Sequence, residues 1–234
     1  MVAKASKYLG HGWYTVAEAA MYCRVPQGTM TRWLFGTKSG NSVIDPEFGS
    51  RERFVSFLDL VQTLAIRDIR AKTNVPLDNI RQAIKHAKDD WDLNHPFARH
   101  HCTYLYGDTI LIRPRQEDKE LIVEASGKHR GQAMLPFVEL YMTSLDFNPA
   151  DGMANKYRIF SSTHRRPITI TMDPRIRFGE PLLPSGHTAF SVLHAFQSEG
   201  GVKQAAEAYG IPAEEVEASR QFGMYLNQDQ KRAA

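Results

Sequence analysis

The residues best suited to chemistry lie in the segment HPFARHHC, residues 95–102, where three histidines stand close to one cysteine. Imidazole and thiolate groups are the usual ligands of structural zinc, but such a site needs four ligands at defined spacings. Neighbouring side chains of an extended segment point to opposite sides, and no second Cys/His pair follows at zinc-finger spacing. The pattern therefore favours polar residues beside a strand, and we expect no metal and no cofactor.

Signatures of catalysis are also missing from the sequence. His187 and His194 are spaced so that they could share one face of a helix, but no carboxylate accompanies them. There is no glycine-rich phosphate loop, no Gly-x-Ser-x-Gly and no His-Glu-x-x-His. We therefore expect a protein that is not an enzyme.

Two short helices joined by a tight turn are indicated by YTVAEAAMYCRVPQGTMTRWLFG, residues 14–36. Thr15 and Glu18 have the spacing of a capping box, which satisfies free N–H groups at a helix start. Arg24–Pro26 interrupts the helical pattern, and proline is well tolerated in the first turn of a new helix. Apolar residues recur at helical spacing in both halves: Val16, Ala19, Ala20, Cys23, Met30, Trp33 and Leu34. This pattern predicts a helix-turn-helix.

The other face of the second helix, and the loop after it, are suited to DNA. Residues 1–40 carry five basic residues against one acid, and residues 36–54 are polar and long enough for a wing. Polar and basic side chains can hydrogen-bond base edges and grip phosphates. The predicted DNA-binding residues are Gln27, Thr29, Thr31, Arg32, Lys38, Arg51 and Arg53. The alternative is a helix pair used only for packing, with solvated charges.

The remaining elements predict an α+β chain, mainly α-helical with a small central antiparallel β-sheet. Helices beginning near Ser56 and Pro76 complete an N-terminal winged helix-turn-helix domain, residues 1–92. Residues 93–163 form a β-rich linking segment with one helix. Its strands are expected in TYLYGDTILIRP, ELIVEA and KYRIFSS, and its helix in GQAMLPFVELYMTSLDF. A further strand, ITITMD, opens the C-terminal region.

The C-terminal domain, residues 164–234, contains an echo of the first helix pair. In VKQAAEAYGIPAEEVEAS, residues 202–219, a shift of 186 positions aligns Pro26 with Pro212, and Gly210 marks the turn. The residues predicted to face outward are now acidic: Glu214, Glu215 and Glu217. Carboxylates would repel DNA phosphates. We therefore expect this copy to bind a partner protein or to dimerise, with DNA binding and simple packing as the alternatives.

Arginines are concentrated around the segment MDPRIRFGEP, residues 172–181. Arg175 and Arg177 follow Arg165 and Arg166, with Asp173 as the one acid among them. The segment could touch DNA when a dimer lies along an operator. Alternatively it is a proline-fixed crossing loop that places Ile176 and Phe178 in the core.

Composition favours a soluble, cytoplasmic protein. Apolar residues make up 42% of the 234 residues, enough for a core, yet no run is long enough for a membrane helix or a signal peptide. Two distant cysteines give no disulfide framework.

The chain also resembles a known family. VSFLDLVQTLAIRDIRAKTNVPLDNIRQAIKHA, HPFARHHCTYLYGD, GQAML and MDPRIRFGEPLLPSG follow one another as they do in antitoxins of VapB/VapC toxin–antitoxin systems. Those antitoxins pair a MerR-like N-terminal helix-turn-helix with a small C-terminal helix-turn-helix domain, long catalogued as a domain of unknown function. The resemblance covers residues 12 to 225.

The resemblance implies a transcriptional repressor that binds the operator DNA of its own operon. It also implies an antitoxin that binds and neutralises a PIN-domain (VapC-type) endoribonuclease toxin. Because operators are usually two-fold repeats, we expect a homodimer. The alternatives are a stand-alone MerR-like transcription regulator without a toxin, and a scaffold that does not bind DNA. MerR-like sensors usually dimerise through a long coiled coil, and no sustained heptad run is visible here.

Overall fold

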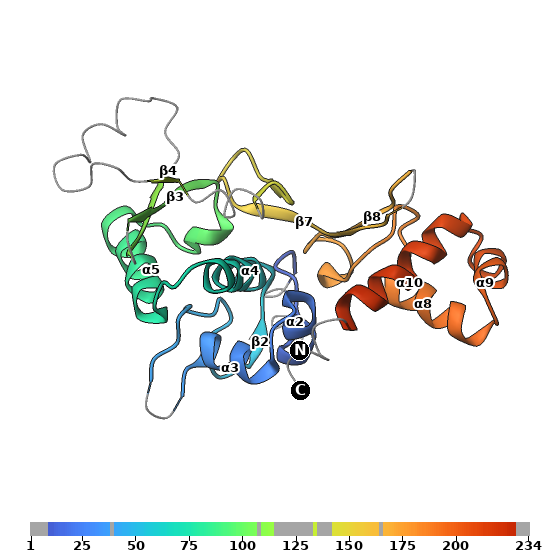
Figure 1. The fold of residues 1–234 in the computed structure, drawn as a ribbon, viewed down its shortest axis with the longest axis horizontal. Coiled ribbons are helices and arrows are strands. Elements are labelled where there is room, and N and C mark those ends of the chain that lie inside the picture. Colours follow the sequence, from blue (N-terminus) through green and yellow to red (C-terminus); the bar gives the residue numbers. More distant parts are fainter. Residues whose placement is uncertain are drawn as a thin grey trace.

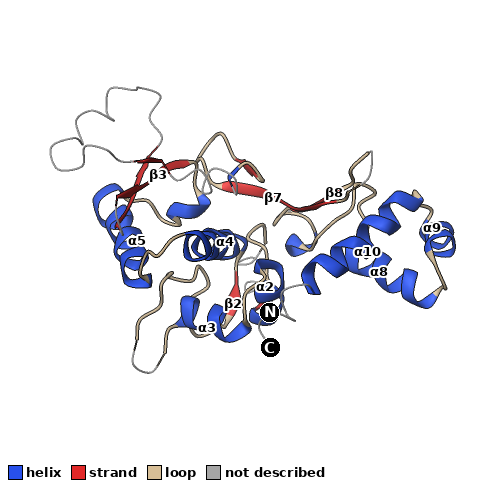
Figure 2. Cartoon of the chain, viewed as in Figure 1, coloured by secondary structure: helices blue, strands red, loops and turns tan. Residues whose placement is uncertain are grey.

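The computed structural model describes residues 9–37, 40–106, 109–114, 133–134, 142–163 and 166–227. Helices gather at both ends of the molecule, and strands connect them (Figures 1 and 2). The fold is therefore of the α+β kind that the sequence predicts.

Four helices of the N-terminal half begin where the sequence signals place them. The side chain of Thr15 accepts a hydrogen bond from the N–H of Glu18 (3.2 Å), and the carboxylate of Glu18 accepts one from the N–H of Thr15 (2.8 Å). Ser56 and Asp59 form the same reciprocal pair. The predicted capping box of Thr15 and Glu18 is thus confirmed, and α4 begins near Ser56 as predicted. The helices are α2 (Val16–Cys23), α3 (Gln27–Phe35), α4 (Phe57–Lys72) and α5 (Leu77–Trp91).

A short strand pair ties the start of this unit to its middle. Strand β1 (Tyr14–Thr15) pairs antiparallel with β2 (Phe54–Val55), so the chain entering α2 lies beside the chain entering α4. The guanidinium of Arg67 donates to the carbonyl of Cys23 (2.9 Å), which fixes the end of α2 against α4. The side chains of Cys23, Met30 and Leu34 are fully buried in the resulting core, as the helical spacing predicted.

The middle of the chain contains more strands than predicted. Strands β3 (His101–Tyr106) and β4 (Thr109–Pro114) form the expected hairpin, and β5 (Ala133–Met134) joins the other side of β3. A second sheet has the order β6-β7-β8, from Leu145–Phe147, Ala154–Ser161 and Thr169–Met172. The single small sheet of the sequence prediction is therefore two antiparallel three-stranded sheets among the described residues.

Two stretches of a predicted helix are strands. Residues 133–134 and 145–147 lie within the segment 131–147 that the sequence suggested to be helical, and both are strands, whereas Met142 between them is helical and residues 135–141 lie outside the described residues. Pairing with β3 and β7 determines their conformation, and a helical spacing of apolar residues does not report such partners. The predicted strand ELIVEA lies outside the described residues.

The predicted C-terminal helix pair is present as α9 (Val202–Tyr209) and α10 (Ala213–Asn227), and α8 (Ala189–Ser198) precedes it. Single turns of 3-10 helix lie earlier in the chain, at Pro96–Ala98 before β3 and at Arg177–Gly179 between β8 and α8. Gly210 ends α9 with a φ of 62°, in the left-handed region where glycine carries no steric penalty. Thr188 caps α8 by accepting a hydrogen bond from the N–H of Ser191 (3.2 Å).

Two hydrogen bonds join the N-terminal unit to the segment that leads into these helices. The N–H of Trp13 donates to the carbonyl of Phe178 (3.0 Å), and the hydroxyl of Tyr14 donates to the carbonyl of Gly179 (2.9 Å). A Cβ at position 179 would collide with the Tyr14 hydroxyl, so the close approach requires glycine. The guanidinium of Arg24 also lies 4.3 Å from the ring centre of Tyr225 on α10.

The crossing segment places its apolar residues in solvent. Ile176 and Phe178 are about half exposed, at 50% and 49%. The alternative that places Ile176 and Phe178 in the core is therefore wrong. The buried residues of this segment are Asp173 and Gly179, on either side of them. None of the helices described is long and apolar enough to cross a lipid bilayer.

Replacing Tyr14 with phenylalanine tests the junction. The change removes the only hydroxyl that satisfies the Gly179 carbonyl in the described structure, and we expect unfolding to become easier by about 1 to 3 kcal/mol. Chemical denaturation at neutral pH measures this. Tyr209→Phe is the matched control, because the described residues show no hydrogen bond from the Tyr209 hydroxyl. Equal stability of the two variants would contradict a structural role for the bond.

Candidate nucleic-acid interface

Helix α3 has one buried and one accessible face. Met30, Trp33 and Leu34 are buried, whereas Gln27 and Arg32 are exposed. Thr29 and Thr31 are half-buried, and the Thr31 hydroxyl donates to the carbonyl of Gln27 (2.9 Å). The face predicted to contact DNA is therefore accessible, with Arg32 as its one cation.

The turn before α3 sets the direction of this helix. Arg24 adopts a left-handed conformation with a φ of 54°, which lets its N–H close the end of α2. Val25 donates its N–H to the carbonyl of Ala20 (3.0 Å), and Pro26 stands at the N-cap of α3. The sequence predicted Pro26 one position further into the helix. In either place proline needs no N–H partner, so the new helix begins without a lost hydrogen bond.

The loop after α3 is held firmly at its root. The carbonyl of Trp33 accepts hydrogen bonds from the N–H groups of Val43 (2.7 Å) and Ile44 (3.2 Å), and both of these side chains are buried. Arg81 of α5 donates to the carbonyls of Ser42 (2.9 Å) and Asn41 (3.2 Å). The loop is polar in composition, but its apolar residues attach it to the core.

The three loop cations of the sequence prediction have different surroundings. Arg51 is exposed. Arg53, also exposed, has its guanidinium carbon 5.4 Å from the ring centre of Phe35, which places it beside the end of α3. Lys38 lies outside the described residues. Both arginines are accessible for phosphate contacts, and Arg53 lies beside the end of α3.

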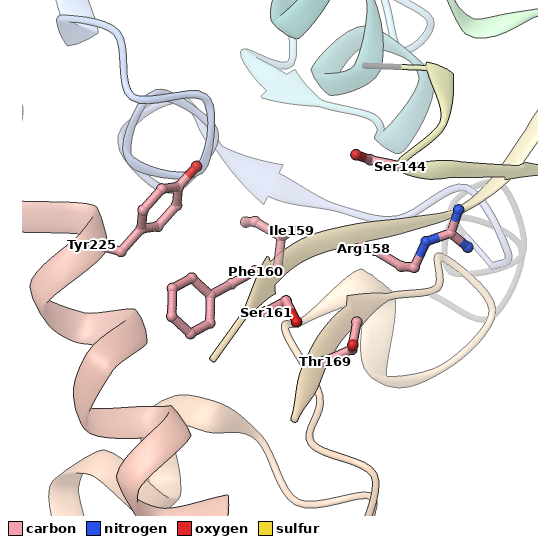
Figure 3. A pocket seen from close by; sticks show the side chains of 7 residues that line it. All are labelled: Ser144, Arg158, Ile159, Phe160, Ser161, Thr169 and Tyr225. Atoms are coloured by element: carbon pink, nitrogen blue, oxygen red, sulfur yellow. The ribbon is translucent and has the colours of Figure 1, made fainter. Parts of the chain in front are cut away.

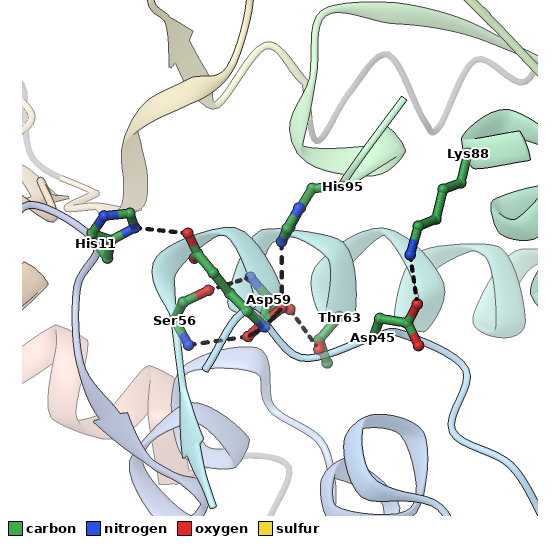
Figure 4. A network of polar contacts seen from close by, with 8 residues as sticks. His11, Asp45, Ser56, Asp59, Thr63, Lys88 and His95 are labelled. Atoms are coloured by element: carbon green, nitrogen blue, oxygen red, sulfur yellow. Dashed lines mark hydrogen bonds and ion pairs between the residues drawn. The ribbon is translucent and has the colours of Figure 1, made fainter. Parts of the chain in front are cut away.

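A buried polar network joins the loop to α4 (Figure 4). The carboxylate of Asp59 is fully buried and accepts hydrogen bonds from the N–H groups of Glu47 (3.1 Å) and Ser56 (3.3 Å). The Nε2 atom of His95 lies 4.0 Å from it. The Glu47 carboxylate contacts Nδ1 of His11 at 2.7 Å. Burial raises the pKa of Asp59 to about 7, although the hydrogen bonds from Glu47 and Ser56 oppose the shift.

The sequence predicted a helix beginning near Ser56, but gave no sign that Asp59 in its first turn holds the loop. A second ion pair, Lys88 Nζ to Asp45 Oδ2 at 3.0 Å, joins the loop to α5 (Figure 4). Arg81 and Lys88 are seven residues apart and so lie on one face of that helix. This spacing was the available signal, but it does not reveal what the face contacts.

The acidic residues of the second helix pair do not form an outward row. Glu214 is exposed, but Glu215 is only 5% exposed and its carboxylate accepts a hydrogen bond from the N–H of Ser185 (3.3 Å). Glu217 is half-buried and forms a forked ion pair with Arg220 (2.6 and 2.8 Å). Ala218, on the same helix, is fully buried. The prediction that the three glutamates face outward holds for Glu214 and is wrong for Glu215, because α10 packs against both α8 and α9.

Among the side chains that the structure describes, the candidate ligand residues are not brought together. No group of three or more His, Cys, Asp or Glu able to hold a metal ion occurs in the described part of the chain. The ring centres of His100 and Phe147 lie 5.1 Å apart. The side chains of His101 and Cys102 are not among those that the structure describes. His187 precedes α8 and packs on Tyr209, so it shares no helical face with His194.

A surface hollow of about 520 Å³ lies between β7, β8 and the end of α10 (Figure 3). Phe160 and Tyr225 line it, with ring centres 5.4 Å apart. Its one cation, Arg158, is already bonded to the carboxylate of Asp146 and to the carbonyl of Leu145 (3.4 Å). With this cation occupied, the hollow offers no free charge for a ligand, and α3 remains the better candidate.

Comparison with known proteins shows a distant relationship. No protein-family model matches the chain. It is 24% identical over 231 residues to the protein named "Putative antitoxin VapB45" from Mycobacterium tuberculosis (strain ATCC 25618 / H37Rv), covering 87% of this chain and 90% of that protein. The crystal structure of Rv2018 from Mycobacterium tuberculosis is similar, with a TM-score of 0.59 at 19% identity, over 88% of this chain and 96% of that one. The structural likeness supports the fold.

The network makes a prediction about pH. The folded chain holds a proton on Asp59 up to about pH 7, whereas the ordinary pKa of the group is 3.8, so the folded state binds more protons between these values. The free energy of unfolding must therefore fall as pH rises from about 4 to about 7. The loss is about 1.4 kcal/mol for each pH unit over which Asp59 is protonated in the folded state and ionised in the unfolded state. Asp59→Asn removes the titration.

Chemical denaturation of wild type and Asp59→Asn at several pH values between about 4 and 7 measures this effect. We expect the wild type to lose stability relative to the variant as pH rises. His95, whose pKa burial lowers, acts with the opposite sign but is present in both proteins. Asp89→Asn, at an exposed position of α5, is the control. A stability difference that stays constant with pH would refute the shift.

Proposed function

We propose that this chain is the antitoxin of a toxin–antitoxin pair, which represses its own operon by binding DNA and neutralises a PIN-domain endoribonuclease. The observation that carries the proposal is the similarity to a protein named as an antitoxin along nearly the whole of both chains. The exposed polar face of α3 supports the DNA-binding part. Both activities belong to the cytoplasm.

In this proposal residues 1–92 form a MerR-like winged helix-turn-helix. Helices α2 and α3 are the two helices of the motif, and the loop between α3 and β2 is the wing. Helix α3 enters the major groove, where Gln27, Thr29, Thr31 and Arg32 meet base edges and phosphates. Arg51 and Arg53 of the wing, together with Lys38, bind the phosphate backbone. Arg32 makes no ion pair among the described residues, so its donors are available.

The toxin is bound elsewhere, by the linking segment 93–163 or by the C-terminal domain 164–234. Of the three glutamates predicted for partner binding, Glu214 is exposed, and Glu217 lies half-buried in its pair with Arg220. Glu215 is hydrogen-bonded to Ser185 inside the C-terminal domain, so we do not include it among the residues that contact the toxin. An acidic surface attracts a basic one and speeds association. Glu214 is therefore the residue of this set that a toxin would meet.

Arg32→Ala tests the DNA-binding part. If Arg32 pairs with a base, its loss should weaken binding to the promoter DNA of the operon by about 1 to 3 kcal/mol and relax specificity at that base. Fluorescence anisotropy titration with a labelled promoter fragment measures both. Lys203→Ala is the matched control, since Lys203 is an exposed cation on α9, outside the proposed interface.

An unchanged affinity for Arg32→Ala, with tight wild-type binding, would remove Arg32 from the interface. Binding that is also insensitive to salt would argue against phosphate contacts altogether, because these weaken steeply as salt rises.

Purification of the tagged chain from its native host tests the antitoxin part. We expect a small PIN-domain protein to co-elute in stoichiometric amount, and its ribonuclease activity to appear only when the chain is removed. The measurement is mass spectrometry of the complex followed by an RNA-cleavage assay with and without added chain. Recovery of the chain with promoter DNA but no such protein would instead favour a stand-alone MerR-like regulator.

A further inference from the structure

Most of the large apolar side chains that are exposed in the described part of the chain lie in two short segments. Among the described residues, five large apolar side chains are exposed, and four of them lie in the two short segments 9–13 and 176–178. Single exposed apolar residues are ordinary, but a contiguous group marks an interaction surface. The four are Leu9 (62%), Trp13 (41%), Ile176 (50%) and Phe178 (49%).

These two segments are far apart in sequence and adjacent in space. The N–H of Trp13 donates to the carbonyl of Phe178 (3.0 Å), and their ring centres lie 6.3 Å apart. The Trp13 ring also packs edge-on against Phe54 at 4.7 Å. Trp13, Phe54 and Phe178 therefore form one aromatic surface, with Ile176 beside it. We call this surface the aromatic patch.

The backbone holds the patch in an unfavourable conformation. Arg177 and Phe178 have φ values of 45° and 55°, in the left-handed region that bulky residues rarely adopt. Asp173 and Gly179 support this turn, since Ile176 donates its N–H to the carbonyl of Asp173 (3.0 Å) and Gly179 donates to that of Ile176 (2.9 Å). Such strain persists only where the surrounding structure enforces it, and it clusters at functional positions.

Charges of both signs border the patch. Arg175 is neutralised by a forked ion pair with Asp173 (2.6 and 2.8 Å). Arg177 and Glu180 are exposed, and neither makes an ion pair with any residue that the structure describes. An apolar centre with one unpaired cation and one unpaired anion is complementary to itself, as a two-fold interface requires.

We propose that the aromatic patch is the surface through which two copies of this chain pair. Ile176 and Phe178 of the two copies pack together at the two-fold axis, and Arg177 of each copy faces Glu180 of the other. The biological use of this dimer rests on the proposed function, because a two-fold operator is read by paired recognition helices. The assignment of the surface itself rests on the geometry above.

Two other occupants suit the surface less well. Aromatic rings flanked by arginine can stack on single-stranded nucleic acid, but the unpaired Glu180 would repel its phosphates. The rings of Trp13, Phe54 and Phe178 also meet edge-on, at 75° and 76°, and do not form parallel stacking platforms. A toxin would need its own matching charges, whereas a second copy already carries both.

Analytical ultracentrifugation of the full chain, without DNA or toxin, tests the proposal. We expect the wild type to be a dimer, and Ile176→Asp and Phe178→Asp each to raise the dissociation constant at least about tenfold. Both positions are half exposed, and aspartate tolerates a left-handed φ at 178, so folding should survive. Met224→Asp, at the exposed apolar residue on α10, is the matched control and should leave the dimer intact.

Charge reversal tests the cross-pairing directly. Arg177→Glu and Glu180→Arg should each weaken the dimer, and the double variant should restore it, because the pairs are re-formed with exchanged signs. Wild-type chains that remain monomeric would overturn the proposal, as would an undisturbed dimer in all variants or a double variant no better than the singles.

The same variants separate this inference from the proposed function. A dimer that Phe178→Asp dissociates would uphold the surface even if no promoter fragment or PIN-domain protein were bound. A monomer whose capture of a purified PIN-domain toxin is lost in Phe178→Asp would overturn the second copy as occupant and assign the patch to the toxin.

Discussion

The hydrogen bond from the Tyr14 hydroxyl to the Gly179 carbonyl is the contact on which the arrangement of the molecule depends. Tyr14 lies in β1, immediately before α2, and Gly179 ends the turn that leads towards α8. Together with the Trp13–Phe178 hydrogen bond and the Arg24–Tyr225 contact, this buried bond joins the first helix pair to the C-terminal part of the chain. The same approach brings Trp13 beside Phe178, so a packing requirement inside the molecule creates the exposed aromatic patch outside it.

The helix pairs α2–α3 and α9–α10 share a turn but differ in what packs around their second helix. In both, a turn with a left-handed residue and a proline precedes the second helix. The face of α3 that carries Arg32 remains open to solvent, whereas the equivalent position on α10, Ala218, is fully buried. Helix α10 is longer and is packed between two neighbours, so it has little free surface to read DNA. The pattern of apolar residues repeats because the turn repeats, and the exposed surface depends on what packs around it.

Local signals in the sequence predicted the helices well, since a capping box or a glycine turn acts within a few residues. The start of α4 at Ser56 and the turn at Gly210 follow from such signals. Contacts between distant segments were not predictable in this way. Phe178 is hydrogen-bonded through its carbonyl to Trp13, and Glu215 through its carboxylate to Ser185. Among the candidate DNA contacts, sequence pattern identified the accessible side of α3, while the attachment of its neighbouring loop depends on Asp59 and Arg81 from other elements.

That attachment has a consequence for binding. Backbone hydrogen bonds to Trp33, the buried carboxylate of Asp59 and the Lys88 to Asp45 pair all hold the loop between α3 and β2 before any ligand arrives. A segment ordered in advance loses little conformational entropy when it binds. Arg53 is likewise restrained against Phe35. The buried acid is costly to keep ionised, but in exchange its oxygens satisfy two N–H groups at the root of the loop. The network thus favours a rigid surface beside α3, formed by folding rather than by contact with a partner.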